Sequence, residues 1–186
     1  MTIRPATKQD ADSAALLLYE AMHDIAHQLT GQSDPDDVLR VLADYFRQED
    51  NRLSFRQALV KELDRQVAGI MVCYHGRDAE RLDQPILDHL RAAANDPSIR
   101  LDQEADLDEF YIDTLSVSPA FGRRGIGREL LQAAELQAKR SGSSRIALVV
   151  DQDNEAAYSL YVKLGYEKDK MIHINCKPYR HMIKLL

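Results

Sequence analysis

The chain has 186 residues, of which 45% are hydrophobic and 29% charged, and its formal net charge is −6. This length and composition fit a single globular domain spanning residues 1–186, and the negative charge argues against a general nucleic-acid binder. The N-terminus carries no apolar signal segment and no run reaches the length of a membrane span, so we expect a soluble, cytoplasmic protein that does not bind membranes.

The N-terminal part is predicted to alternate strands and amphipathic helices. Hydrophobic periodicity predicts strands over 2–6, 53–59 and 66–74, and helices over 14–25 and 36–48. The second and third strands are expected to form an antiparallel meander.

Two groups of residues raise the question of a metal site. His23, Asp24 and His27 share one predicted helix, but the chain has no HExxH motif, so solvated or substrate-facing histidines are favoured and no metal is predicted. Cys73 and Cys176 form neither a CxxC pair nor a metal spacing, and both are predicted to be buried free thiols.

An insertion at about 75–108 precedes the next strand. It contains a predicted helix over 85–94, and the acidic run 102–109 follows. A connection this long is usually functional or part of an interface, so we expect it to cover the functional site or to mediate dimer contacts. The acidic run can attract a cation, although such runs are more often solvated.

A strand, a glycine-rich loop and a helix follow between residues 109 and 138. The strand 109–117 is closed by Pro119, and the helix is expected over 128–138. The loop carries Gly122, Arg123, Arg124, Gly125, Ile126, Gly127 and Arg128. Backbone N–H groups, the helix dipole and the arginines together predict a phosphate or pyrophosphate cradle. The alternative is a tight strand-to-helix connection with solvated arginines.

The loop excludes two common nucleotide sites. It has no Gly-Lys-Ser/Thr ending, which an NTPase phosphate loop requires. Leu130 stands where a dinucleotide-binding fingerprint has its third glycine.

A second motif lies in the C-terminal part. The apolar strand 144–150 is followed by a helix that ends near Gly165, and strands are expected over 170–174 and 180–186 around a turn at 175–179. The helix region carries Asn154, Ala157, Leu160, Tyr161, Gly165 and Tyr166.

Together the two motifs resemble the GNAT superfamily of N-acetyltransferases. Val117, Pro119, Gly125 and Gly127 match its acetyl-CoA pyrophosphate loop, and the residues from Asn154 to Tyr166 match its second motif. Gly122 departs from the pattern, because the family usually has Gln or Arg there.

The resemblance implies a mixed α/β fold: a twisted, mostly antiparallel sheet flanked by helices on both faces. It also implies direct transfer of an acetyl group from acetyl-CoA, as co-substrate, to a primary amine of a small molecule or peptide, without a metal. A homodimer is possible. A non-catalytic acyl-CoA sensor and a longer acyl donor remain the alternatives.

The same resemblance suggests roles for individual residues. Acetyl-CoA would be held by residues 122–128, by the backbone of Leu115 and Val117, and by the region of Asn154 and Tyr161. Tyr161 occupies the position of the family's acid beside the CoA sulfur; it can also be a buried aromatic, and Tyr158 is the neighbouring candidate.

The general base is less clear. Glu109, Tyr111 and Asp113 share one face of an extended strand, unless a bulge changes the alternation. Asp113 is preferred over Glu109 because it lies further inside the apolar strand, where a buried carboxylate tends towards a raised pKa. It can equally have a structural role, and proton loss through water needs neither residue. By family topology, His173, Tyr179 and His181 are further candidates for the edge of the acceptor site.

Overall fold

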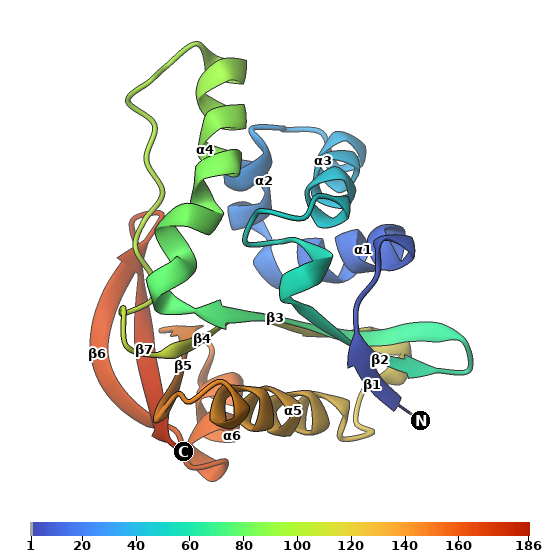
Figure 1. Cartoon of the computed structure of the whole chain (residues 1–186), viewed down its shortest axis with the longest axis vertical. Coiled ribbons are helices and arrows are strands. Elements are labelled where there is room, and N and C mark those ends of the chain that lie inside the picture. Colours follow the sequence, from blue (N-terminus) through green and yellow to red (C-terminus); the bar gives the residue numbers. More distant parts are fainter. Residues whose placement is uncertain (1) are drawn as a thin grey trace.

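The computed structural model describes residues 2–186 and contains one seven-stranded sheet between two layers of helices (Figure 1). The strands, in the spatial order β1-β2-β3-β4-β5-β7-β6, are β1 (Thr2–Pro5), β2 (Ala58–Leu63), β3 (Gln66–His75), β4 (Phe110–Val117), β5 (Arg145–Asp151), β7 (Lys177–Leu185) and β6 (Glu167–Ile174). The helices are α1 (Ala11–Met22), α2 (Asp24–Thr30), α3 (Pro35–Arg47), α4 (Ala79–Ala94), α5 (Ile126–Arg140) and α6 (Glu155–Lys163).

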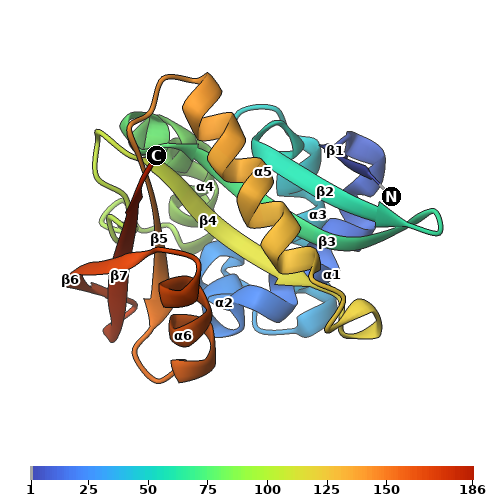
Figure 2. The ribbon, with the colours of Figure 1, turned by 90° about the horizontal axis from the view of Figure 1, so that it is seen from below.

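The helices cover both faces of the sheet. Helices α1 to α4 lie on one face and α5 and α6 on the other (Figure 1). In Figure 2, which views the molecule from below, α5 lies across the strands of the sheet. Its apolar residues join the core on that face. This architecture confirms the predicted fold class. No helix within residues 2–186 is both long enough and apolar enough to cross a membrane.

Strands β4 and β5 form the one parallel pair, and they separate after a short contact. Their pairing runs only from Phe110 opposite Ile146 to Ile112 opposite Leu148. Every other neighbouring pair in the sheet is antiparallel. The sheet therefore opens from Asp113 onwards, and the open edges of β4 and β5 face a space between them.

A β-bulge marks the same position on the other side of β4. Thr114 pairs with Val72 and Ile112 with Cys73, so Asp113 has no partner on β3. The bulge reverses the alternation of side chains. Ile112 packs into the core beneath α5, and so does Leu115, three residues later. The reversal takes effect only after Asp113, so Tyr111 and Asp113 still share the face opposite Ile112, where both contact the side chains around Arg52 and Glu104.

The first predicted helix is broken in two. His23 has φ 46° and ψ −116°, which ends α1 and starts α2 in a new direction. The expected i, i+1, i+4 arrangement of His23, Asp24 and His27 on one continuous helix is therefore wrong. Apolar residues continue on both sides of the break, so hydrophobic periodicity did not reveal it.

Two further element boundaries differ from the sequence expectation. The strand expected at 53–59 is instead β2 at Ala58–Leu63. Leu53 is buried, but it belongs to an irregular connection and not to a strand, so its apolar character did not indicate a strand. Helix α4 starts at Ala79 and contains Pro85, which the sequence placed at the helix start.

The cysteines and the last hairpin also need correction. Cys73 is buried as predicted, but Cys176 is exposed. Asn175 and Cys176 have φ of 49° and 60° and form a tight turn between β6 and β7. The expected turn residues Lys177–Tyr179 belong instead to β7.

Residues 95–109, which we call the strap, connect the end of α4 to the start of β4. Most of the carboxylates in its acidic run have partners: Asp102 accepts from Asn175 N–H (2.7 Å), Glu104 from Arg52, Asp106 from Lys170, and Asp108 from Arg145. The run is thus a set of attachments to the sheet and its neighbours, and not a purely solvated face.

Gly76 allows the strap to approach β3 closely. Its N–H donates to Glu109 O (2.9 Å), and a Cβ at this position would lie 1.8 Å from the carbonyl oxygen of Asp106. We predict that Gly76→Ala lowers the free energy of unfolding by about 3 kcal/mol, because the strap must move. Urea unfolding measures the difference.

Gly127→Ala is the matched control for Gly76→Ala. Its added Cβ would meet Val117 at an ordinary 3.7 Å, within the first turn of α5. Alanine favours helix over glycine by up to about 1 kcal/mol, so this variant should not lose stability. Equal unfolding midpoints for the two variants would contradict the prediction.

Candidate functional site

A cavity of about 630 Å³ opens where β4 and β5 separate. Thr114 and Leu115 line it from β4, Val149 and Val150 from β5, and Tyr161 from α6. The α1–α2 junction and the β6–β7 hairpin complete its wall. The cavity therefore draws on both halves of the chain and lies along the open edge of the sheet.

The glycine-rich loop follows β4 and leads into α5. Gly125 is the N-cap residue with φ 78°, a left-handed conformation that favours glycine. Among the described residues, no hydrogen-bond acceptor is found for the backbone N–H groups of residues 123–128. These N–H groups and the positive end of a 15-residue helix favour an anionic group.

The side chains around the loop agree with an anion site. Arg123, Arg124 and Arg128 are exposed, and none forms an ion pair with any of residues 2–186. A Cβ on Gly127 would make only ordinary contacts, at 3.7 Å from Val117 and 3.9 Å from Leu115. The residues present fit a pyrophosphate.

Tyr161 brings a phenol group to the cavity. It is largely buried, its ring packs edge-on against Tyr166, and its hydroxyl has no hydrogen-bond partner within residues 2–186. Burial raises the pKa of Tyr161 to about 12. The hydroxyl therefore stays protonated at neutral pH and can donate a hydrogen bond into the cavity. Asn154 caps α6 by accepting from Ala157 N–H (3.0 Å).

A buried arginine, Arg52, also lines the cavity. Arg52 Nε donates to Asp113 Oδ2 (2.7 Å), and Arg52 Nη2 donates to Glu104 Oε1 (2.8 Å). Tyr74 donates its hydroxyl to Asp113 Oδ2 (2.8 Å), and Thr114 donates to Oδ1 (2.8 Å). Asp113 thus lies in the cavity wall, as its sequence position suggested, and its carboxylate accepts from three side chains.

The Arg52 network extends to a third carboxylate. Arg52 Nη1 lies 3.3 Å from Asp83 Oδ1 on α4. Burial, together with the nearby charges of Asp113 and Glu104, raises the pKa of Asp83 to about 6 even though Arg52 acts in the opposite direction. One guanidinium therefore does not compensate the three carboxylates.

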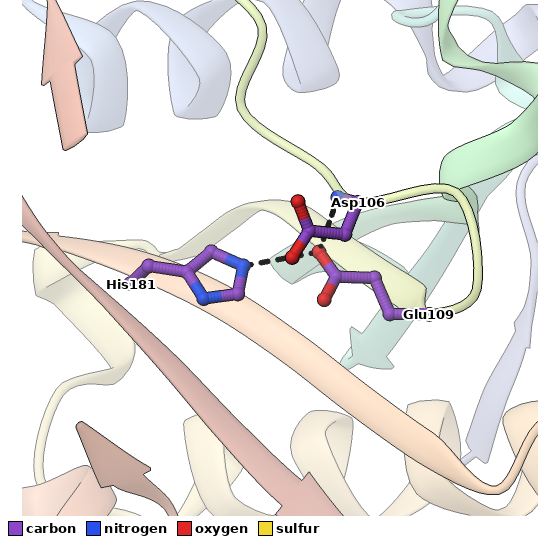
Figure 3. A group of neighbouring side chains, drawn as sticks. All are labelled: Asp106, Glu109 and His181. Carbon is purple, nitrogen blue, oxygen red and sulfur yellow. Dashed lines mark hydrogen bonds and ion pairs between the residues drawn. The ribbon is translucent and has the colours of Figure 1, made fainter. Parts of the chain in front are cut away.

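Glu109, the second candidate base, is not among the residues that line this cavity. Its fully buried carboxylate accepts from Asp106 N–H (2.9 Å) and lies 3.1 Å from His181 Nε2 (Figure 3). These contacts join the end of the strap to β7. Glu109 and Asp113 therefore contact different groups at different points along β4.

Asp106, Glu109 and His181 are close enough to hold a metal ion (Figure 3). However, Lys170 Nζ lies 2.7 Å from each oxygen of Asp106, and Arg145 Nη2 lies 3.6 Å from Glu109 Oε2. Two basic side chains already supply positive charge here, so we interpret this cluster as a set of contacts that attach the strap to the sheet.

Of the other residues singled out in the sequence, His23 and Tyr179 line the cavity. Asp24 also lines it and pairs with Lys177 (2.9 Å). His27 lies instead against Tyr19, 3.2 Å from its hydroxyl. His173 is exposed on β6 and, like His181, is not among the lining residues.

Comparison with known proteins identifies the family. The model of the acetyltransferase (GNAT) family matches residues 19–166. The chain therefore belongs to the GNAT family, which confirms the resemblance found in the sequence. Membership places it among the acyltransferases.

Solved structures agree over the whole fold. An acetyltransferase structure is 31% identical, aligns over 100% of this chain and 99% of its own, and has a TM-score of 0.82. An N-acetyltransferase from Staphylococcus aureus Mu50 is 26% identical over 98% and 100% of the two chains, with a TM-score of 0.83. The PaiA N-acetyltransferase from Thermoplasma acidophilum, solved with coenzyme A, shares the fold at 14% identity over 100% and 98%, with a TM-score of 0.59.

Curated relatives match over a shorter stretch. The N-alpha-acetyltransferase RimI of Mycobacterium tuberculosis is 40% identical over 60 residues, 32% of this chain and 36% of that protein. The N-alpha-acetyltransferase 30 of Schizosaccharomyces pombe is 35% identical over 63 residues, 34% and 42% of the two chains. The matches span less than half of these relatives.

Sequence reasoning did not find Arg52 or Glu104. Arg52 lies in an irregular connection without a motif, and Glu104 is one of several acids in the strap. Only a partial signal existed, namely the unusual length of the insertion beside the motif strand. Their proximity to Asp113 depends on three segments that are distant in sequence.

The raised pKa of Asp83 predicts a pH-dependent contribution to stability. A carboxyl whose pKa rises from 3.8 to about 6 on folding binds protons more tightly in the native state. Its contribution is therefore fully present below about pH 4 and is lost as the pH rises through about 6. We expect Asp83→Asn to be more stable than wild type at pH 7 by about 2–3 kcal/mol.

Urea unfolding of wild type and Asp83→Asn at several pH values between 4 and 8 measures this difference. The stability advantage of the variant should grow between about pH 4 and 7, since the two side chains are both uncharged at the acid end. A difference that does not change with pH would contradict the assignment.

Proposed function

We propose that this protein transfers the acetyl group of acetyl-CoA to the primary amine of a small molecule or peptide. The observation that carries the proposal is the cavity at the β4–β5 opening, which is lined by a tyrosine whose hydroxyl is free and by several carboxylates. Acetyl-CoA would supply an acetyl thioester. The remaining tasks fall to groups of this chain.

Residues of the first motif would hold the co-substrate. The N–H groups of residues 123–128 and the exposed arginines would bind its pyrophosphate. The open edge of β4 would offer backbone N–H groups near Leu115 and Val117 to the rest of the molecule and to the thioester carbonyl.

Charge in the cavity favours a cationic acceptor. Its wall includes five carboxylates, on Asp24, Glu104, Asp113, Asp151 and Asp153, and two basic side chains, Arg52 and Lys177. An alkylammonium group is attracted into such a site, and attack then requires loss of its proton.

Asp113 is the better placed of the two candidate bases, because it lines the cavity and Glu109 does not. A carboxylate that already accepts from three donors is a poor direct proton acceptor, so we infer that Asp113 holds the ammonium and that the proton leaves through water. At the other end, the Tyr161 hydroxyl would donate to the departing sulfur.

Tyr161→Phe tests the acid. We predict that kcat for acetyl transfer falls by about 10²-fold to 10⁴-fold, while acetyl-CoA binding stays close to wild type. Thiol release across a panel of amines and calorimetric titration with acetyl-CoA measure the two quantities. Tyr158→Phe is the control, because Tyr158 is not among the lining residues and its ring instead stacks under Arg180.

Binding of acetyl-CoA without turnover of any amine, and no difference between wild type and Tyr161→Phe, would favour the alternative of an acyl-CoA sensor. Faster thiol release from a longer acyl-CoA than from acetyl-CoA would support an acyltransferase whose donor carries a longer acyl chain.

Asp113→Asn and Glu109→Gln separate the two carboxylates. We predict that Asp113→Asn lowers kcat by about 10²-fold or more, since the acceptor loses its charged neighbour. Glu109→Gln should keep kcat and lose stability, because it weakens the contact with His181. Initial rates and urea unfolding for both variants provide the test. A larger loss of kcat in Glu109→Gln would reverse the assignment.

A further inference from the structure

We propose that Glu104 is a specificity-determining residue, which binds a second cationic group on the amine acceptor. The inference rests on the proposed function, because it concerns the acceptor end of the same cavity. It names the acceptor class as small amines that carry two ammonium groups.

The strap holds Glu104 at a fixed place. Asp102, two residues before it, accepts from the N–H of Asn175 in the β6–β7 hairpin (2.7 Å). Asp106, two residues after it, is held by Lys170 (2.7 Å). Tyr111 also donates its hydroxyl to Glu104 Oε2 (2.8 Å). Glu104 is therefore positioned before any ligand binds, as a selective contact requires.

The charge around Glu104 is incomplete. The side chain of Arg52 is 5% exposed and pairs with carboxylates from three segments: Asp83 on α4, Glu104 on the strap and Asp113 on β4. One positive charge thus faces three negative charges. Buried charge without a partner is costly, so a cation entering from the cavity would be stabilised there. The raised pKa of Asp83 is a second sign of the same negative potential.

Glu104 is the most accessible carboxylate of the network on the cavity side. Its side chain is 14% exposed, against 3% for Asp113, and both residues line the cavity. Each carboxylate oxygen of Glu104 accepts a hydrogen bond from one side chain and keeps a further lone pair for a ligand. Asp113 accepts from Arg52, Tyr74 and Thr114 and is more enclosed.

Asp83 faces a different space. A second cavity, of about 620 Å³, lies beneath α4 and the strap, and its wall includes Asp83, Arg52 and Glu104. Arg52 and Glu104 therefore lie between the two cavities, whereas Asp83 is not among the residues lining the first. Asp83→Asn removes one negative charge from the same arginine without changing the acceptor cavity, which makes it a matched control.

The test compares diaminobutane with butylamine as acceptors for wild type, Glu104→Gln and Asp83→Asn. Wild type should show the higher kcat/KM for the diamine. Glu104→Gln should raise the KM for the diamine by about 10-fold to 100-fold, the effect of losing one charge-assisted contact. The values for butylamine and the KM for acetyl-CoA should change little. Asp83→Asn should reduce the preference for the diamine much less than Glu104→Gln does, because Asp83 does not line this cavity.

Three results would overturn the proposal: no preference for the diamine in wild type, equal losses for both amines in Glu104→Gln, or the same change of preference in Asp83→Asn. Circular dichroism of both variants controls for folding.

Failure of the transferase itself would be recognised separately, as acetyl-CoA binding with no reaction of any amine. Calorimetric binding of diaminobutane to wild type and to Glu104→Gln then decides the cation site alone. Weaker binding to the variant supports the site, and equal or absent binding rejects it.

Discussion

The limited pairing of β4 with β5 is the constraint on which the site depends. Two parallel strands that continued side by side would satisfy each other's backbone groups and leave no opening. Here the ladder stops after Ile112 and Leu148, and the bulge at Asp113 turns β4 at that point. The exposed strand edge, the cavity and the approach to the glycine-rich loop all follow from this separation.

The bulge also decides which side chains reach the cavity. Because one extra residue reverses the alternation, Leu115 returns to the core beneath α5, while Asp113 meets Arg52 and Tyr74. Glu109 lies on the same face as Asp113, but before the point at which β4 and β5 separate. Their positions along the strand thus give two similar carboxylates different surroundings, which is how proteins give different tasks to chemically equal groups.

Buried ionic contacts hold the strap in place. Removing a partner from such a contact is costly, although the intact pair often contributes little net stability compared with an apolar core. Their value here is positional. Arg52 fixes Glu104 and Asp113 in the cavity wall, and Lys170 and His181 fix the end of the strap near β4. An acidic segment that would otherwise be solvated is thereby given a single conformation over the cavity.

The sequence by itself determined the fold class and the family. Pro119, the closely spaced glycines and the later run from Asn154 to Tyr166 each combine a local backbone requirement with its neighbours in the chain. Such local signals can be recognised from the sequence alone, because glycine and proline restrict or release their own φ and ψ, and helical periodicity is visible within a few residues. The same reasoning located Tyr161 and the pyrophosphate loop as candidates.

Only the tertiary structure decided which charged side chains line the cavity. Arg52, Glu104 and Asp113 are brought together from three segments by the bulge and by the attachments of the strap. The break at His23, the exposure of Cys176 and the different partners of Glu109 and Asp113 were likewise not visible in the sequence. The reason is physical: contacts between distant segments depend on packing and charge pairing in three dimensions, and no local propensity records them.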